Sequence, residues 1–148
     1  MKLPTRFPSL TALCLLASAA VIAAASAQSG MYRARLSEVP VTPQTYRTIT
    51  GVGEVFATLD DSTLSLTGTY QGMSSAASAA HVHNAPRAMN GPPIGALEVT
   101  PAPSGELSGS LELTAAQVEA LRNEALYIVI HSENNPGGEI RGWLLPRE

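Results

Sequence analysis

The 148-residue sequence contains a single cysteine, Cys14, which lies in an apolar stretch near the N-terminus. We expect this stretch to be removed as an export signal, so the remaining chain would have no disulfide even in an oxidising compartment. Stability should then come from a packed sheet and its core, or from a bound ion. The absence of cysteine also removes thiolate competition at any histidine site for a metal.

Positive charge is scarce as well. After position 27 the chain carries seven cations, all of them arginines that are scattered in the sequence, against twelve Asp and Glu, which gives a net charge of −5. Binding of nucleic acid depends on clustered cations that neutralise phosphates. We therefore expect no nucleic-acid partner.

Only one long apolar run occurs, from about Leu10 to Ala25. Lys2 and Arg6 precede it, and small residues at positions 25 and 27 follow it, so residues 1–27 are interpreted as a cleavable signal peptide. The alternative is an uncleaved membrane anchor, but a spanning helix needs roughly 20 predominantly apolar residues, and this run is shorter. The sequence thus predicts a periplasmic or secreted protein with no membrane span after cleavage.

Residues 28–148 are enough for one domain with a modest core. Short segments rich in β-branched and aromatic residues alternate with Gly and Pro, which is typical of strands and turns. The segment 127–131 is so β-branched that we expect a buried central strand. Thr114, with Gln117 three residues later, predicts the capped start of one short helix. The expected fold is an all-β Greek-key β-sandwich, similar to that of superoxide dismutases or immunoglobulin domains, with that single helix.

Three stretches of this sequence resemble the CHRD (chordin-type) domain in order and spacing, and with the strand at 51–59 they cover nearly all of residues 28–148. They are Leu36-Ser37-Glu38-Val39-Pro40, Ala80-His81-Val82-His83, and Tyr127-Ile128-Val129-Ile130-His131 running into Asn135-Pro136-Gly137-Gly138-Glu139-Ile140-Arg141-Gly142. The resemblance implies the fold and an exported location for a CHRD domain over residues 28–148. It implies no chemistry, because bacterial members mostly lack an assigned activity and the animal namesake uses the module within a growth-factor antagonist.

A second pattern is similar to the copper ligands of copper/zinc superoxide dismutases, which are also Greek-key sandwiches. It consists of His81-Val82-His83, a later His131, and an Asn-Pro-Gly-Gly turn into the last strand. The chain lacks a fourth His to bridge to zinc, further His for a zinc site, and the disulfide of those enzymes. This resemblance therefore implies a copper site and not the dismutase activity.

The histidine spacing supports a metal site without reference to any family. Side chains two apart on a strand point to the same face, so His81 and His83 can approach one ion. If the strand of His131 lies beside theirs, three imidazoles converge. Three neutral imidazoles suit copper or zinc, and the Irving–Williams order favours copper. Water is the simplest fourth ligand, and Met89 is a weaker candidate.

The structural alternative is that His81 and His83 are exposed rings and that His131 is hydrogen-bonded at a strand end. We also expect Arg141, on the same strand face as Glu139, to form a cross-strand ion pair with Glu38.

Three functional hypotheses follow from the sequence. The first is an exported protein that holds one metal ion through His81, His83 and His131, copper before zinc, for storage, delivery or tolerance. The second is a structural or interaction module that binds another envelope or extracellular protein without metal. The third is a dismutase-like enzyme, for which we expect weak activity or none, because a net charge of −5 repels superoxide.

Overall fold

The computed structural model describes residues 29–147 of the chain. The signal peptide expected over residues 1–27 lies outside the described residues and stays a prediction. Within residues 29–147, no helix has both the length and the apolar character that crossing a membrane requires.

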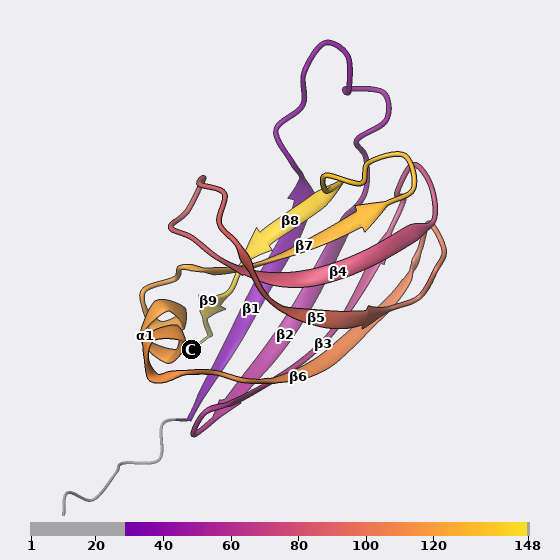
Figure 1. Cartoon of the computed structure of the whole chain (residues 1–148). Helices are drawn as coiled ribbons and strands as arrows, with labels where there is room; N and C mark the ends of the chain where they lie inside the picture. The colour runs from indigo at the N-terminus through magenta and orange to yellow at the C-terminus, as the bar shows by residue number, and fades with distance from the viewer. Residues whose placement is uncertain (1–28, 148) are drawn as a thin grey trace, which may run out of the picture.

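The described chain forms nine strands and one helix (Figure 1). In chain order these are β1 (Gly30–Glu38), β2 (Val52–Asp60), β3 (Thr63–Gln71), β4 (Ala77–Asn84), β5 (Pro93–Val99), β6 (Gly105–Glu112), α1 (Ala115–Arg122), β7 (Leu126–Ser132), β8 (Ile140–Trp143) and β9 (Leu145–Pro146). The prediction of a mostly β domain with one short helix is confirmed.

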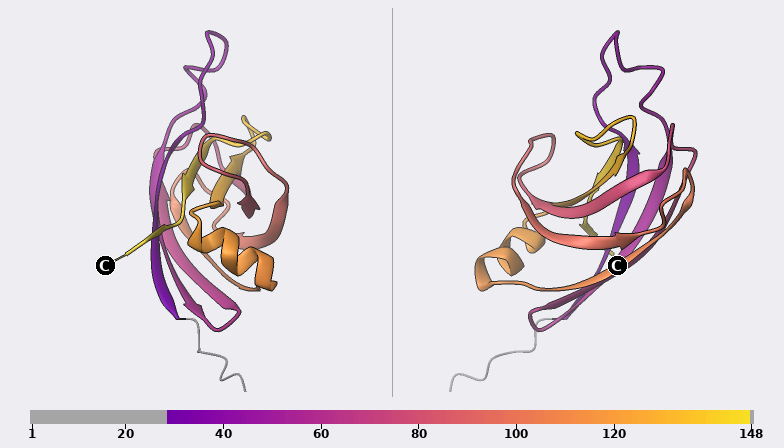
Figure 2. Two further views of the ribbon diagram at one scale, coloured as in Figure 1. Left: turned by 90° about the vertical axis from the view of Figure 1, so that its left-hand side faces the viewer. Right: turned by 45° about the vertical axis from the view of Figure 1, so that its right-hand side comes forward.

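Eight strands make one closed antiparallel sheet in the order β1-β2-β3-β6-β5-β4-β7-β8, and β8 pairs back to β1. The two-residue strand β9 adds to β1. Figure 2 shows that the sheet curves around its core, with β1, β2 and β3 on one side and β4 and β7 on the other. The order β7-β4-β5-β6 is that of a Greek key.

The sandwich prediction holds only in part. A sandwich has two separate sheets, whereas here the two sides are joined by hydrogen-bonded pairs at both margins, β5 with β6 and β1 with β8. Closure pairs strands whose edges would otherwise expose free N–H and C=O groups.

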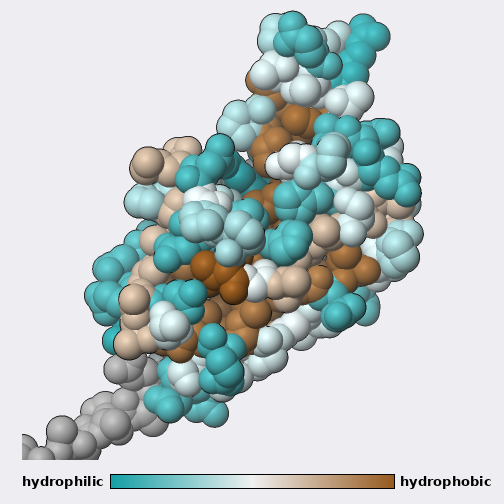
Figure 3. Space-filling model, in the orientation of Figure 1, coloured by the Kyte–Doolittle hydropathy of each residue, from teal (hydrophilic) through white to brown (hydrophobic). Residues whose placement is uncertain are grey.

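On the face seen in Figure 3, hydrophobic surface gathers in patches bounded by hydrophilic residues.

The core follows the alternation of the sequence. In β2, Val55, Ala57 and Leu59 are buried while Phe56 is partly exposed, as a strand with one face on the core requires. Strand β7 is buried on both faces and pairs with β4 on one side and β8 on the other, so the prediction of a buried central strand is confirmed.

Helix α1 begins as its sequence predicts. The Thr114 hydroxyl accepts a hydrogen bond from the Gln117 amide, and the Gln117 side chain accepts one from the Thr114 amide. This reciprocal pair satisfies two amide groups that an isolated helix start leaves without partners. Val118 and Leu121 on the inner face of α1 pack into the core.

Candidate functional site

The three histidines lie on two neighbouring strands and share one face. His81 and His83 belong to β4 and His131 belongs to β7, and these strands pair antiparallel with His81 opposite Val129 and His131 opposite Ala79. Because paired residues point to the same side of a sheet, all three imidazoles lie on the outer face of this part of the sheet. The intervening residues, such as Val82 and Ile130, point into the main core.

The imidazoles are close enough to share an ion. One ligand nitrogen from each ring can be chosen so that all three lie within 4.8 Å of one another. The ring centroids of His81 and His131 are 5.2 Å apart, and those of His81 and His83 are 6.1 Å apart. Two nitrogens that bind one ion at about 2.0–2.1 Å can be at most roughly 4.2 Å apart, so small ring rotations would complete the approach.

Backbone carbonyls orient two of the rings. His83 Nδ1 lies 2.8 Å from the carbonyl oxygen of Gly91, and His131 Nδ1 lies 2.9 Å from that of Pro136. A carbonyl oxygen only accepts, so each Nδ1 carries a hydrogen, and in the neutral ring the lone pair is then on Nε2. Both Nε2 atoms are buried and have no hydrogen-bond partner among residues 29–147. Metal-ligating histidines show this same arrangement, in which the second ring nitrogen donates to a carbonyl.

The surroundings also keep His131 neutral. Burial lowers the pKa of His131 below its ordinary value of 6.5, because desolvation disfavours the charged ring. The hydrogen bond to the Pro136 carbonyl raises the pKa, and the neighbouring rings of His81 and His83 lower it further. The net direction is downward, so the lone pair of His131 is available at neutral pH.

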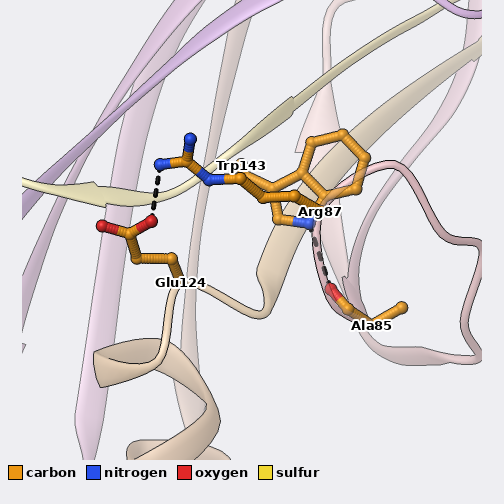
Figure 4. A network of polar contacts seen from close by, with 4 residues as sticks. All are labelled: Ala85, Arg87, Glu124 and Trp143. Atoms are coloured by element: carbon orange, nitrogen blue, oxygen red, sulfur yellow. Dashed lines mark hydrogen bonds and ion pairs between the residues drawn. The ribbon is translucent and has the colours of Figure 1, made fainter.

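The connection between β4 and β5, residues 85–92, lies beside this face and contributes Ala85 to a second small core with Tyr127, Val129 and Trp143. Tyr127 stacks on His83 at 5.1 Å between ring centroids and on Trp143 at 4.8 Å. The Gly91 amide donates to the Tyr127 hydroxyl at 2.9 Å. Figure 4 shows Trp143 Nε1 donating to the Ala85 carbonyl at 3.0 Å. These bonds place the Gly91 carbonyl where it orients His83.

The same connection is held from the side of the helix. Arg87 forms an ion pair with Glu124, just after the C-terminal end of α1 (Figure 4). Ala85 donates its amide hydrogen to the carbonyl of Ala125 at 2.8 Å. These contacts hold the start of the connection, and the bond between Gly91 and Tyr127 holds its end.

Met89 is not part of the cluster. It lies in the same connection, but its side chain is 59% exposed. A pocket of about 490 Å³ beside the imidazoles is lined by His83, His131 and Tyr127, and we call it the histidine pocket. Met89 does not line it. The structure therefore gives no support to Met89 as a fourth ligand.

The family model that matches this chain is the CHRD domain, over residues 32–144. The match spans most of the sequence and includes all three histidines. The chain belongs to the CHRD domain family. No curated protein and no solved structure matches the chain.

The expected ion pair between Arg141 and Glu38 is wrong for this CHRD domain. In the register of β1 and β8, Ser37 lies opposite Arg141 and Glu38 lies opposite Ile140, so Glu38 does not face Arg141 directly. Arg141 Nη1 instead donates to the Asn90 side-chain oxygen at 2.8 Å, and the guanidinium lies 4.9 Å from the Trp143 ring centroid. Arg141 therefore lies beside the histidine pocket, which it helps to line.

Glu139 is a residue whose role the sequence did not reveal. It is fully buried, and its carboxylate accepts hydrogen bonds from the backbone amides of Thr50 and Ser74 and from the side chains of Ser132 and Asn135. Burial by itself would raise the pKa of Glu139, but these hydrogen bonds lower it, and the net direction is downward. The only signal in the sequence was an acidic residue directly after a Gly-Gly turn, which is also typical of a solvated position.

Proposed function

We propose that this CHRD domain binds one metal ion through His81, His83 and His131, with copper as the preferred ion. One observation carries the proposal: the Nε2 atoms of His83 and His131 are buried, lack a hydrogen-bond partner among the described residues, and belong to rings whose Nδ1 atoms bond to carbonyls. A buried polar atom without a partner costs about 1–3 kcal/mol. A metal ion would remove that cost at two atoms at once.

The choice of ion follows from the ligand atoms. The cluster consists of three imidazoles and includes no carboxylate, so it does not suit magnesium or calcium, which prefer oxygen ligands. Neutral nitrogen ligands suit copper and zinc, and the Irving–Williams order favours copper. A water molecule would supply the fourth ligand.

The proposal places the site in an exported protein, where it would serve storage, delivery or tolerance of copper. It does not extend to superoxide dismutation, because the chain has only three histidines and so none for the zinc site and bridging ring of those enzymes. If the site binds no ion, the alternative function is that of a protein-interaction module without metal.

The test is a titration of the metal-free exported protein with copper against a competing chelator of known affinity, repeated with zinc. We expect close to one copper per chain and weaker binding of zinc. His131→Ala should lower copper affinity at least tenfold, and about as much as His81→Ala or His83→Ala, because all three rings would contact the ion.

Met89→Leu is the matched control, since it changes an exposed side chain on the connection between β4 and β5 and should leave affinity unchanged. Circular dichroism of each variant shows whether the fold is retained. Unchanged copper affinity in a folded His131→Ala variant would show that the shared site does not exist.

A further inference from the structure

We propose that the groove beside β1, β8 and β9 binds a small amphiphilic anion, with its carboxylate or phosphate head on the arginines and its apolar body against Trp143. The groove has a volume of about 820 Å³, which is within the range of small-molecule sites. None of the three histidines lines it, although Pro40, Ala88 and Arg141 line both the groove and the histidine pocket.

Positive charge is concentrated in this groove. Five of the seven arginines of residues 29–147 line it, and the only acidic residue that lines it is Glu38. The described residues as a whole carry seven arginines against eleven Asp and Glu, a net charge of −4. Arginines that are scattered along the sequence are thus gathered by the fold into a positive site on an acidic domain, which favours an anionic occupant.

Strand geometry accounts for the gathering. In β1, Ala34 and Leu36 are buried, so Arg33 and Arg35 point outward. Ser37 pairs with Arg141 in β8 and Arg33 pairs with Leu145 in β9, and this continuous register places Arg35 opposite Trp143. On the outer face, Arg33 therefore lies beside Leu145, and Arg35 lies beside Trp143.

Part of this charge has no carboxylate partner. Arg33 pairs with Glu54, and Arg87 pairs with Glu124. Among residues 29–147, no salt bridge neutralises the other three arginines of the groove, which are Arg35, Arg141 and Arg147. Arg141 is held in place by the Asn90 amide oxygen and by the Trp143 ring, and both contacts orient the guanidinium without neutralising it.

The two kinds of lining match the two parts of the proposed ligand. A guanidinium presents a planar fork of donors that fits a carboxylate or phosphate with two parallel hydrogen bonds. Trp143, Leu145 and Pro40 supply an apolar wall next to it. A ligand with only a charged head would contact the arginines alone, and a ligand with only an apolar chain would contact the apolar wall alone.

Trp143 makes the test direct, because it is the only tryptophan of the chain and lines the groove. The full exported protein, freed of metal with a chelator, is titrated with octanoate and with octyl phosphate below their micellar concentrations while tryptophan fluorescence is recorded. Octanol supplies the same apolar chain without charge, and acetate supplies the head without the chain. We expect saturable binding of the amphiphilic anions at least tenfold tighter than that of octanol, and none of acetate at those concentrations.

The stronger of octanoate and octyl phosphate identifies the preferred head group. Arg35→Gln should weaken its binding about fivefold to tenfold and leave octanol binding unchanged, because one charge-assisted contact is lost. Arg47→Gln removes the same charge from an exposed loop position that does not line the groove, and it should have no effect.

Octanol binding as tight as octanoate, or an equal loss in Arg47→Gln and Arg35→Gln, would overturn the proposal. Circular dichroism tests whether Arg35→Gln is folded. If Arg35→Gln does not fold, Arg147→Gln is measured in its place. Since the protein is metal-free throughout, neither result bears on the histidine site.

Discussion

At the scale of single residues, Glu139 is a buried carboxylate that forms no salt bridge within residues 29–147 and is stabilised by hydrogen bonds instead. Its carboxylate receives hydrogen bonds from Thr50 before β2, from Ser74 between β3 and β4, and from Ser132 and Asn135 around the turn after β7. Segments far apart in the sequence therefore meet at one side chain. We infer that Glu139 fixes the relative positions of these three loops at one end of the sheet.

Glu139→Gln should destabilise the domain by about 2–3 kcal/mol at neutral pH. The substitution keeps the shape but removes the charge and turns one acceptor into a donor that faces other donors. The folded pKa of Glu139 is lowered from its ordinary 4.5, so the stability contributed by its ionised form is present above pH 4.5 and is lost as pH falls through the folded pKa.

The measurement is urea unfolding of the wild-type protein and Glu139→Gln at a series of pH values. The difference between them should be largest at neutral pH and should shrink below pH 4.5. Glu133→Gln is the matched control, since Glu133 is exposed and lies near the same turn. A difference that does not change with pH would mean that packing, and not the ionised carboxylate, accounts for the role of Glu139.

At the scale of elements, the connection between β4 and β5 orients one ring of the histidine cluster, that of His83. Gly91 is the critical position, because a Cβ there would lie 1.9 Å from the carbonyl oxygen of Asn84, far inside contact distance. The carbonyl of Gly91 is also the hydrogen-bond acceptor that orients His83. The backbone at this point must therefore approach more closely than any side chain permits.

Gly91→Ala should destabilise the domain by roughly 1–3 kcal/mol and should also weaken copper binding, because the connection must move and the Gly91 carbonyl moves with it. Gly137→Ala provides the comparison for stability, since a Cβ at Gly137 would have nothing within 4 Å. Denaturant unfolding of both variants measures the change in stability, and copper titration of Gly91→Ala measures the change in affinity. If Gly91→Ala leaves both quantities at wild-type values, the connection is not the determinant of His83 orientation.

At the scale of the whole molecule, the proposed ion would bridge β4 and β7, which already pair along most of their length within the closed sheet. Such an ion binds the native state and not the unfolded chain, so it stabilises the protein by mass action. Free copper at one hundred times its dissociation constant should add about 2.7 kcal/mol of stability.

That gain should raise the melting temperature by roughly 8–13 °C for a domain of this size, as measured by differential scanning calorimetry. His83→Ala should abolish the shift, whereas Met89→Leu should retain it. A shift of equal size in His83→Ala would indicate that copper stabilises the fold from some other position.

Local patterns in the sequence predicted the features that depend on neighbouring residues alone. The alternation of a strand places His81 and His83 on one face, because successive side chains point to opposite sides. The Thr114 and Gln117 pair predicts the start of α1, because capping is completed within four residues. The β-branched run of β7 indicates a strand buried on both faces, because such a run has no polar side to expose to water.

Only the tertiary structure decided which distant segments meet. The pairing of β4 with β7 brings His131 to His81, fifty positions away, and closure of the sheet through β1 and β8 gathers the scattered arginines into one groove. The same closure showed one continuous sheet where a sandwich was predicted. Backbone geometry sets periodicity within a strand, but the choice of partner strand depends on packing and loop closure over the whole chain, which no local pattern contains.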